Sequence, residues 1–198
     1  DTNLNDMLNA VVVAADWVGI REVYEAHTPR MIRDGVPVEN GRYSTHGIMV
    51  EVLVDGQFGY YGTPDISKEG VARASKNAFN QAKKASKYAL HSFTSEVRPK
   101  SVGNYKSPFL KDVRDVTAKE LNVLLLEAYK HLKVSDKIVS ASSLASTIET
   151  NFHFISSNGS DIGQQFLMIE FDLSATAVDG SNQQTRTFGG MRGTCRQA

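Results

Sequence analysis

The feature that most constrains this chain is a run of alternating side chains from Gln165 to Ala177. Successive side chains of a β-strand point to opposite faces of the sheet, so every second residue shares a face. One face of this run is apolar, whereas the other carries Glu170, Asp172 and hydroxyl side chains. A strand of this kind is typical of an antiparallel sheet that is covered on one side only. The apolar set consists of Leu167, Ile169, Phe171, Leu173 and Ala175.

Further strands and tight turns extend this β pattern along the chain. The predicted strands are residues 20–27, 30–34, 47–54, 147–154 and 183–188. Glycine preceded by aspartate or asparagine supplies the positive φ angles that a two-residue hairpin turn requires. Such dipeptides occur at Asp34-Gly35, Asn40-Gly41, Asp55-Gly56, Asn158-Gly159 and Asp179-Gly180. The sequence therefore predicts several antiparallel hairpins.

Three segments repeat apolar side chains at the three- and four-residue spacing that predicts an amphipathic helix. They are residues 4–15, which we expect to end before Gly19; residues 67–91, capped by Ser67; and residues 117–132. The second helix carries a stripe of alanines, and small side chains allow a helix axis to approach a sheet closely. The third helix opens with a capping box, in which Thr117 is followed three residues later by Glu120.

The order of these elements predicts the fold class. A helix is followed by strands, then by two long helices and then by more strands. We expect an α+β two-layer sandwich, in which two long helices cover one face of a mostly antiparallel sheet and the N-terminal helix is additional. Residues 92–116 contain two prolines and little periodicity, and they are predicted to be a long loop.

The stretch DGQFGYYG at residues 55–62 is interpreted as a structural hairpin. Asp55 and Gly56 make the turn, and Phe58 and Tyr60 then alternate on one face of the outgoing strand. Gly59 falls on the opposite face, where the lack of a side chain suits the close approach of another backbone. This motif predicts a turn with an aromatic face and does not by itself predict a catalytic site.

Composition excludes some classes of function. The chain has 198 residues with 22 basic and 22 acidic side chains, and this balance argues against binding nucleic acid by bulk charge. The lysines of the second helix are interpreted as a solvated face. One cysteine, Cys195, rules out a disulfide within the chain, and no apolar run reaches about 18 residues. We therefore expect a cytoplasmic protein that does not enter a membrane.

A search for reactive groups yields no self-contained catalytic constellation. In a zinc-peptidase helix the first histidine ligand is followed directly by a glutamate. None of the five histidines of this chain is followed by a glutamate. Cys195 has no cysteine partner, and a role as nucleophile is not favoured. Glu170 and Asp172 share a strand face, where acid–base work is the less favoured interpretation and solubility the more favoured one.

The run GIMVEVLVDGQFGYYGTPDISKEGVARASKNAFNQAKKAS, residues 47–86, resembles the N-terminal domain of the TldD/PmbA family, also called the modulator of DNA gyrase family. The second half is similar too, in the segments ISSNGSDIG, LSATAVDG and QQTRTFGG. The resemblance implies a dimeric metallopeptidase that processes peptides. Its zinc is implied to lie in a C-terminal domain, on a helix with the motif H-E-x-x-x-H and a further cysteine ligand, so no metal or catalytic residue is assigned here.

The resemblance also sets expectations for organisation and role. Residues 1–190 would form the N-terminal domain, and residues 191–198 a tail or the start of a linker to a C-terminal peptidase domain. The chain would be inactive alone, would contact a homologous subunit in a homo- or heterodimer, and would supply one wall of a channel for an extended peptide. Glu170, Asp172 and Arg186 are the candidate wall residues. The alternative is a stand-alone binding or regulatory module that acts on DNA gyrase.

Overall fold

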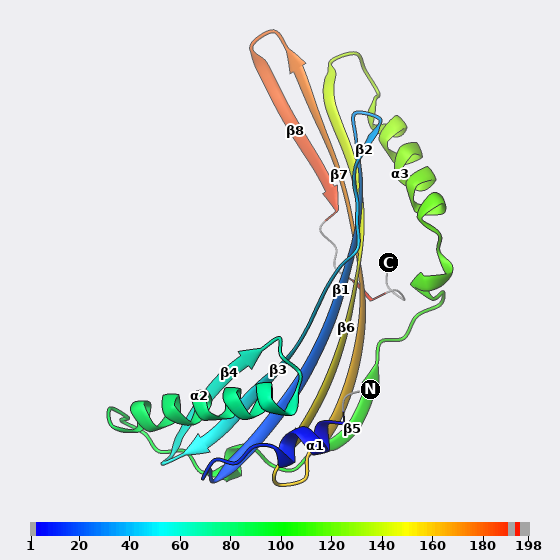
Figure 1. Ribbon diagram of the computed structural model, residues 1–198. Helices are drawn as coiled ribbons and strands as arrows, with labels where there is room; N and C mark the ends of the chain where they lie inside the picture. The colour runs from blue at the N-terminus through cyan, green and yellow to red at the C-terminus, as the bar shows by residue number, and fades with distance from the viewer. Residues whose placement is uncertain (1–2, 190–192, 195–198) are drawn as a thin grey trace. The chain divides into compact units, whose positions relative to one another are not determined.

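The structure is a computed structural model that describes residues 3–189 and 193–194. Its strands belong to one open, mostly antiparallel sheet, and its three α-helices pack on that sheet or on one another (Figure 1). The contacts divide the chain into two compact units. Unit 1 comprises residues 1–25, 45–105 and 150–165, and unit 2 comprises residues 26–44, 106–149 and 166–198. The predicted α+β class with a mostly antiparallel sheet is confirmed.

Three long strands contribute residues to both units. They are β1 (Trp17–Arg33), β6 (Ile138–Ser156) and β7 (Asp161–Asp179). In unit 1 the strand order is β4-β3-β1-β6-β7-β5, with β3 at Tyr43–Val54, β4 at Gln57–Thr63 and β5 at Val102–Lys106. In unit 2, β2 (Val36–Asn40) pairs with β1, and both β8 (Asn182–Gly189) and β9 (Gly193–Thr194) pair with β7.

The hairpin of β3 and β4 forms as the sequence predicts. Asp55 and Gly56 both have positive φ angles, 50° and 72°, as a tight hairpin turn requires. The register pairs Glu51 with Tyr60 and Val52 with Gly59. Because directly paired residues share a face, Glu51 and Tyr60 lie on one side of the hairpin, and Val52 and Gly59 lie on the other.

Helix α2 (Lys68–Ser86) covers the Val52 and Gly59 side of this hairpin (Figure 1). Its alanine stripe is buried at Ala74, Ala78 and Ala82. A Cβ atom added to Gly59 would overlap the carbonyl oxygen of Ala78 and would lie 2.9 Å from the carbonyl carbon of that residue. The predicted close approach of another backbone at Gly59 is therefore confirmed, and that backbone belongs to α2. The core of unit 1 also contains Ile20, Ile48, Val50, Val52, Val54, Val71 and Ile155.

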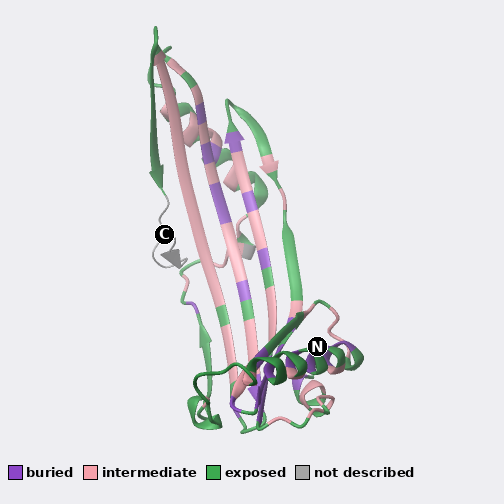
Figure 2. Cartoon of the chain, turned by 90° about the vertical axis from the view of Figure 1, so that its left-hand side faces the viewer, coloured by how far each residue is buried: buried purple, intermediate pink, exposed green. Residues whose placement is uncertain are grey.

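Unit 2 has a smaller core around helix α3 (Ala118–Leu132). Leu125 is fully buried against Ile32 of β1 and Ala145 of β6, and Leu126, Tyr129 and Phe171 pack around them. The Leu125 carbonyl also accepts a hydrogen bond of 2.7 Å from the Ser143 hydroxyl. Strand β8 is exposed along its length and β7 is mostly half-buried, as Figure 2 shows.

The predicted capping box opens α3. The Thr117 hydroxyl accepts a hydrogen bond from the Glu120 backbone, and the Glu120 carboxylate accepts one of 2.7 Å from the Thr117 backbone. The hydrogen bond from the Thr117 backbone, followed by that from the Thr117 hydroxyl, lowers the pKa of Glu120 below its ordinary value. The N-terminus of this helix is thus fixed by local sequence.

Three boundary predictions are wrong. Helix α1 covers only Leu4–Asn9, because the β-branched run that begins at Val11 disfavours a helix. Gly19 does not follow a helix; it lies inside β1, where a Cβ atom would meet the rings of Trp17 and Phe154. Helix α2 ends at Ser86, where we expected residue 91.

The predicted loop at residues 92–116 is also partly ordered into regular structure. It contains the 3₁₀ turns Ser95–Val97 and Val113–Asp115, and strand β5, which pairs with β7. All five residues of β5 are exposed, and no apolar alternation marks this strand in the sequence. Within residues 3–189 and 193–194, no helix is both long and apolar enough to cross a membrane.

Replacing Gly59 by alanine is expected to lower the free energy of unfolding by about 1–3 kcal/mol or more, because the new methyl group overlaps the backbone of α2. Gly62→Ala is the matched control on the same strand, since a Cβ atom there has no neighbour within 4 Å. Urea denaturation measures both variants. Equal stability of the two variants would show that α2 does not lie against Gly59.

Replacing Thr117 by alanine is expected to raise the pKa of Glu120 toward its ordinary value and to lower the free energy of unfolding by about 1 kcal/mol. A carboxyl whose folded pKa is depressed stabilises the fold above its unfolded pKa, and this contribution is lost as the pH falls through the folded pKa. Carboxyl NMR titration measures the shift. Thr94→Ala is the control, because the Thr94 side chain makes no cap hydrogen bond. An unchanged Glu120 titration in Thr117→Ala would contradict the capping box.

Candidate functional site

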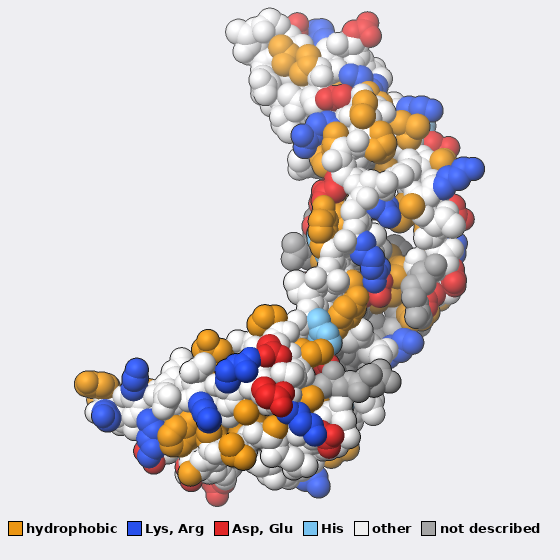
Figure 3. All heavy atoms as spheres, in the orientation of Figure 1, with side chains coloured by type: hydrophobic (Ala, Val, Ile, Leu, Met, Phe, Trp, Pro, Cys, Tyr) orange, Lys and Arg blue, Asp and Glu red, His pale blue; other side chains and the backbone are white. Residues whose placement is uncertain are grey.

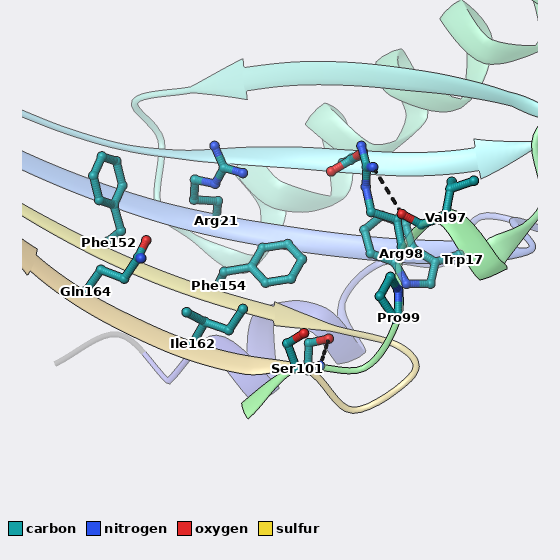
Figure 4. Close-up of a pocket in the computed structure, with 12 residues that line it drawn as sticks. Trp17, Arg21, Val97, Arg98, Pro99, Ser101, Phe152, Phe154, Ile162 and Gln164 are labelled. Atoms are coloured by element: carbon teal, nitrogen blue, oxygen red, sulfur yellow. Dashed lines mark hydrogen bonds and ion pairs between the residues drawn. The ribbon is translucent and has the colours of Figure 1, made fainter. Parts of the chain in front are cut away.

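A pocket of about 400 Å³ lies on the sheet of unit 1 (Figure 4). We call it the unit-1 pocket. Strands β1, β3, β6 and β7 form its floor, and the segment from Val97 to Ser101 forms one side. Trp17, Phe152, Phe154 and Ile162 make its apolar surface, whereas Arg21, Glu51, Arg98 and Gln164 supply charged and amide groups. Its volume falls within the range of about 300–1,000 Å³ that is common for small-ligand sites.

One cation of the pocket, Arg98, is neutralised by Glu51. The Arg98 Nε and Nη2 atoms both donate to the same Glu51 carboxylate oxygen, at 3.1 and 2.6 Å. Glu51 is only 8% exposed, so its charge is compensated within the protein rather than by water. The hydrogen bond to Glu51 raises the pKa of Arg98 above its ordinary value.

An aromatic cluster adjoins this ion pair. Phe58 packs on Trp17 and Phe93, with ring centroids 6.2 and 5.7 Å apart, and the Arg98 guanidinium lies 4.6 Å from the Phe58 ring centroid. Tyr60 stacks on Phe58, and partial burial, followed by the charge of Glu51, raises the pKa of its hydroxyl. Phe58 and Tyr60, two of the three aromatic residues of the DGQFGYYG motif, therefore support the pocket from one end.

The second cation of the pocket, Arg21, is not neutralised in this way. Its side chain is exposed, and among the described residues it makes no hydrogen bond, ion pair or ring contact. Counting along the antiparallel pair from Val18, whose carbonyl accepts from the Ser157 backbone, places Arg21 across from Phe154. Figure 4 shows Arg21, Phe152 and Phe154 on the same side of the sheet. The pocket therefore has a net charge of +1 from its side chains.

The hairpin residues singled out from the sequence have structural roles. Asp55 forms an ion pair of 2.6 Å with Lys83 of α2, and Gly56 lies against Ser92, where a side chain would clash. Gly59 allows the backbone of α2 to approach the strand closely. Phe58 and Tyr60 stack on each other at one end of the pocket. The interpretation of this motif as a structural hairpin is confirmed for the turn and for Gly59.

The three candidate wall residues of unit 2 do not share one face. Glu170 and Asp172 lie at even-numbered positions of β7, whereas the register pairs Arg186 of β8 with the odd-numbered Ala175. Paired residues share a face, so Arg186 lies on the side of the sheet opposite to the two carboxylates. Its guanidinium donates instead to the Gln184 side chain and the Thr185 carbonyl. Their contact with a peptide stays a prediction.

The described residues do not fit a zinc site. Three histidines each have one polar partner: His27 meets the Ser146 hydroxyl at 2.6 Å, His46 meets Glu22 at 2.9 Å, and His153 meets Asp161 at 2.9 Å. Across residues 3–189 and 193–194, no three histidine, cysteine, aspartate or glutamate side chains come together. Cys195 lies outside the described residues, as do most of the predicted tail residues 191–198, of which Gly193 and Thr194 form β9.

The lysines of α2 lie on its solvent side, where basic side chains gather in Figure 3. Lys76, Lys84 and Lys87 are exposed, and Lys83 is engaged by Asp55. Sequence reasoning assigned this helix face correctly but missed the pocket. The signal was present in part: Trp17, Gly19 and Arg21 alternate on one face of β1, but the strand was expected to begin only at Ile20.

Comparison with known families gives two matches along the chain. Residues 18–82 match domain 1 of the PmbA/TldA metallopeptidases, and residues 111–195 match the central domain of the same family. Together these matches cover most of the chain. No curated protein sequence matches it.

Solved structures show the same fold at low sequence identity. A candidate modulator of DNA gyrase from Bacteroides thetaiotaomicron has a TM-score of 0.74 at 14% identity, over 93% of this chain and 43% of its own. A second one, from Thermotoga maritima, has a TM-score of 0.65 at 14% identity, over 87% and 38%. TldE from Thermococcus kodakarensis has a TM-score of 0.58 at 14% identity, over 93% and 41%. The chain thus spans about two fifths of each of these proteins.

Replacing Glu51 by glutamine is expected to lower the pKa of Tyr60 and to lower the free energy of unfolding by about 1–2 kcal/mol, since Arg98 loses its charged partner. NMR titration of the tyrosine ring carbons and urea denaturation measure the two effects. Glu96→Gln, an exposed change of the same charge, is the control. A Tyr60 titration that stays in place in Glu51→Gln would show that the carboxylate does not act on this hydroxyl.

Proposed function

This chain belongs to the PmbA/TldD metallopeptidase family, and from that premise we propose that it is a non-catalytic, peptide-binding part of such a peptidase. It would hold an extended peptide on its sheet while a zinc centre formed by other residues cleaves that peptide. The observation that carries this proposal is the unit-1 pocket, which combines aromatic rings with the Arg21 guanidinium, a cation that has no partner among the described residues.

The contacts of the pocket support binding rather than bond cleavage. Its only described carboxylate, Glu51, is buried and engaged by Arg98, so it is not free to act as a general base. No histidine or cysteine is among the described residues that line it. The remaining groups, which are rings, an amide and a guanidinium, are those that orient a ligand.

Pairing with a second family subunit is part of the same proposal. In unit 2, Val123 and Leu124 of α3 are 48% and 52% exposed, and Phe188 of β8 is 74% exposed. Exposed apolar side chains of this size support a contact surface, since burial of such groups drives association. The alternative function is a regulatory module that acts on DNA gyrase, which is the activity named for two of the similar structures.

The test is peptide binding and cleavage by the 198-residue chain. Unblocked ten-residue peptides of mixed sequence are added with and without zinc, NMR follows binding, and mass spectrometry follows hydrolysis. We expect binding with dissociation constants in the micromolar to millimolar range, typical of weak recognition, and no cleavage. Sedimentation of the same sample reports self-association.

Two outcomes would overturn the proposal. Cleavage by the purified chain would contradict the non-catalytic role, and the absence of any peptide binding would contradict the peptide-binding role. Capture of DNA gyrase without peptide binding would favour the alternative. The control is the same titration with the chain unfolded in urea, which removes the pocket and leaves the composition unchanged.

A further inference from the structure

We propose that the unit-1 pocket recognises a carboxylate joined to an apolar side chain, as presented by the C-terminal residue of a peptide. The inference rests on the proposed peptide-binding function and names the part of the peptide that is read. It follows from four groups that line the pocket: Arg21, Phe152, Phe154 and Gln164.

The charge balance of the pocket selects an anion. Arg98 is engaged by Glu51 at 2.6 Å, so its charge is already compensated. Arg21 has no described partner, and its guanidinium presents parallel N–H groups that match the two oxygens of a carboxylate. One uncompensated cation fits one carboxylate. A peptide segment without an acidic group would leave this cation unpaired.

The neighbours of Arg21 select an apolar side chain next to that carboxylate. Phe154 lies across from Arg21, and its ring stacks on Trp17 with a centroid distance of 6.3 Å. Phe152 lies two residues from Phe154 along β6, on the same side of the sheet (Figure 4). An aromatic or branched side chain placed beside these rings gains burial and ring contacts. The cation and the rings are thus adjacent on neighbouring strands.

An amide group of the pocket completes the recognition of a peptide end. Gln164 of β7 is half-buried and makes no hydrogen bond within the described residues, although it can donate and accept. A peptide group offers both a donor and an acceptor, so Gln164 suits the amide that precedes the terminal residue. A free aromatic acid lacks this amide and would use only the cation and the rings.

The decisive experiment compares four probes by NMR titration of the 198-residue chain. They are acetyl-Ala-Ala-Ala-Phe with a free C-terminal carboxylate, the same peptide as its C-terminal amide, acetyl-Ala-Ala-Ala-Gly with a free carboxylate, and 3-phenylpropionate. We expect the first to bind at least about tenfold more tightly than the amide, because a charge-assisted bond to Arg21 is lost. The glycine peptide and phenylpropionate are expected to bind more weakly than the first probe.

Variants assign the effect to the pocket. Arg21→Gln is expected to reduce the affinity for the free acid about tenfold and to abolish the preference over the amide. Phe154→Leu is expected to reduce the preference for phenylalanine over glycine. Lys76→Gln, which removes the same charge from the solvent side of α2, is the control and should change neither. Chemical shifts of residues far from the pocket verify that each variant is folded.

The outcomes separate this inference from the proposed function. Equal binding of acid and amide, or a preference that persists in Arg21→Gln, overturns the carboxylate assignment while peptide binding stands. Phenylpropionate that binds as tightly as the peptide acid overturns the peptide end as the ligand. If no peptide of any kind binds, the proposed function falls and this inference falls with it.

Discussion

The approach of α2 to the strand β4 at Gly59 is the contact on which the rest of unit 1 depends. The helix can lie this close because its inner face carries alanines and because the strand has no side chain below Ala78. The contact covers one face of the hairpin and buries Val50, Val52 and Val71. The opposite face of the hairpin, which carries Glu51, Phe58 and Tyr60, is not covered by this helix.

That opposite face contains the candidate site. A sheet face without a covering helix would expose its aromatic residues to water. Here the segment from Phe93 to Ser101 covers one end, where Arg98 links Glu51 and Phe58. The rest stays open as a pocket with Arg21 and Phe154 at its floor. The same alternation that builds the core therefore builds the surface of the pocket, because adjacent strand residues face opposite ways.

Membership in the PmbA/TldD family is consistent with this division of roles. The chain matches the first and central domains of the family, and nothing in its described residues assembles a metal centre. A peptidase needs both a hydrolytic centre and a surface that aligns the peptide with it. The unit-1 pocket offers groups for alignment, and its one carboxylate is already held by an arginine. Binding and cleavage would then reside in different parts of the assembled protein.

Local sequence determined the elements whose signals are local. The turn at Asp55-Gly56, the Ser67 cap and the Thr117–Glu120 capping box form as predicted, since each depends on backbone angles or hydrogen bonds within a few residues. Only the tertiary structure decided which distant residues meet. Arg98 reaches Glu51 across 47 positions of the chain, and β5 joins the sheet without any apolar pattern of its own. Strand register likewise separated Arg186 from Glu170 and Asp172, because pairing between strands depends on long-range contacts that no short window of sequence contains.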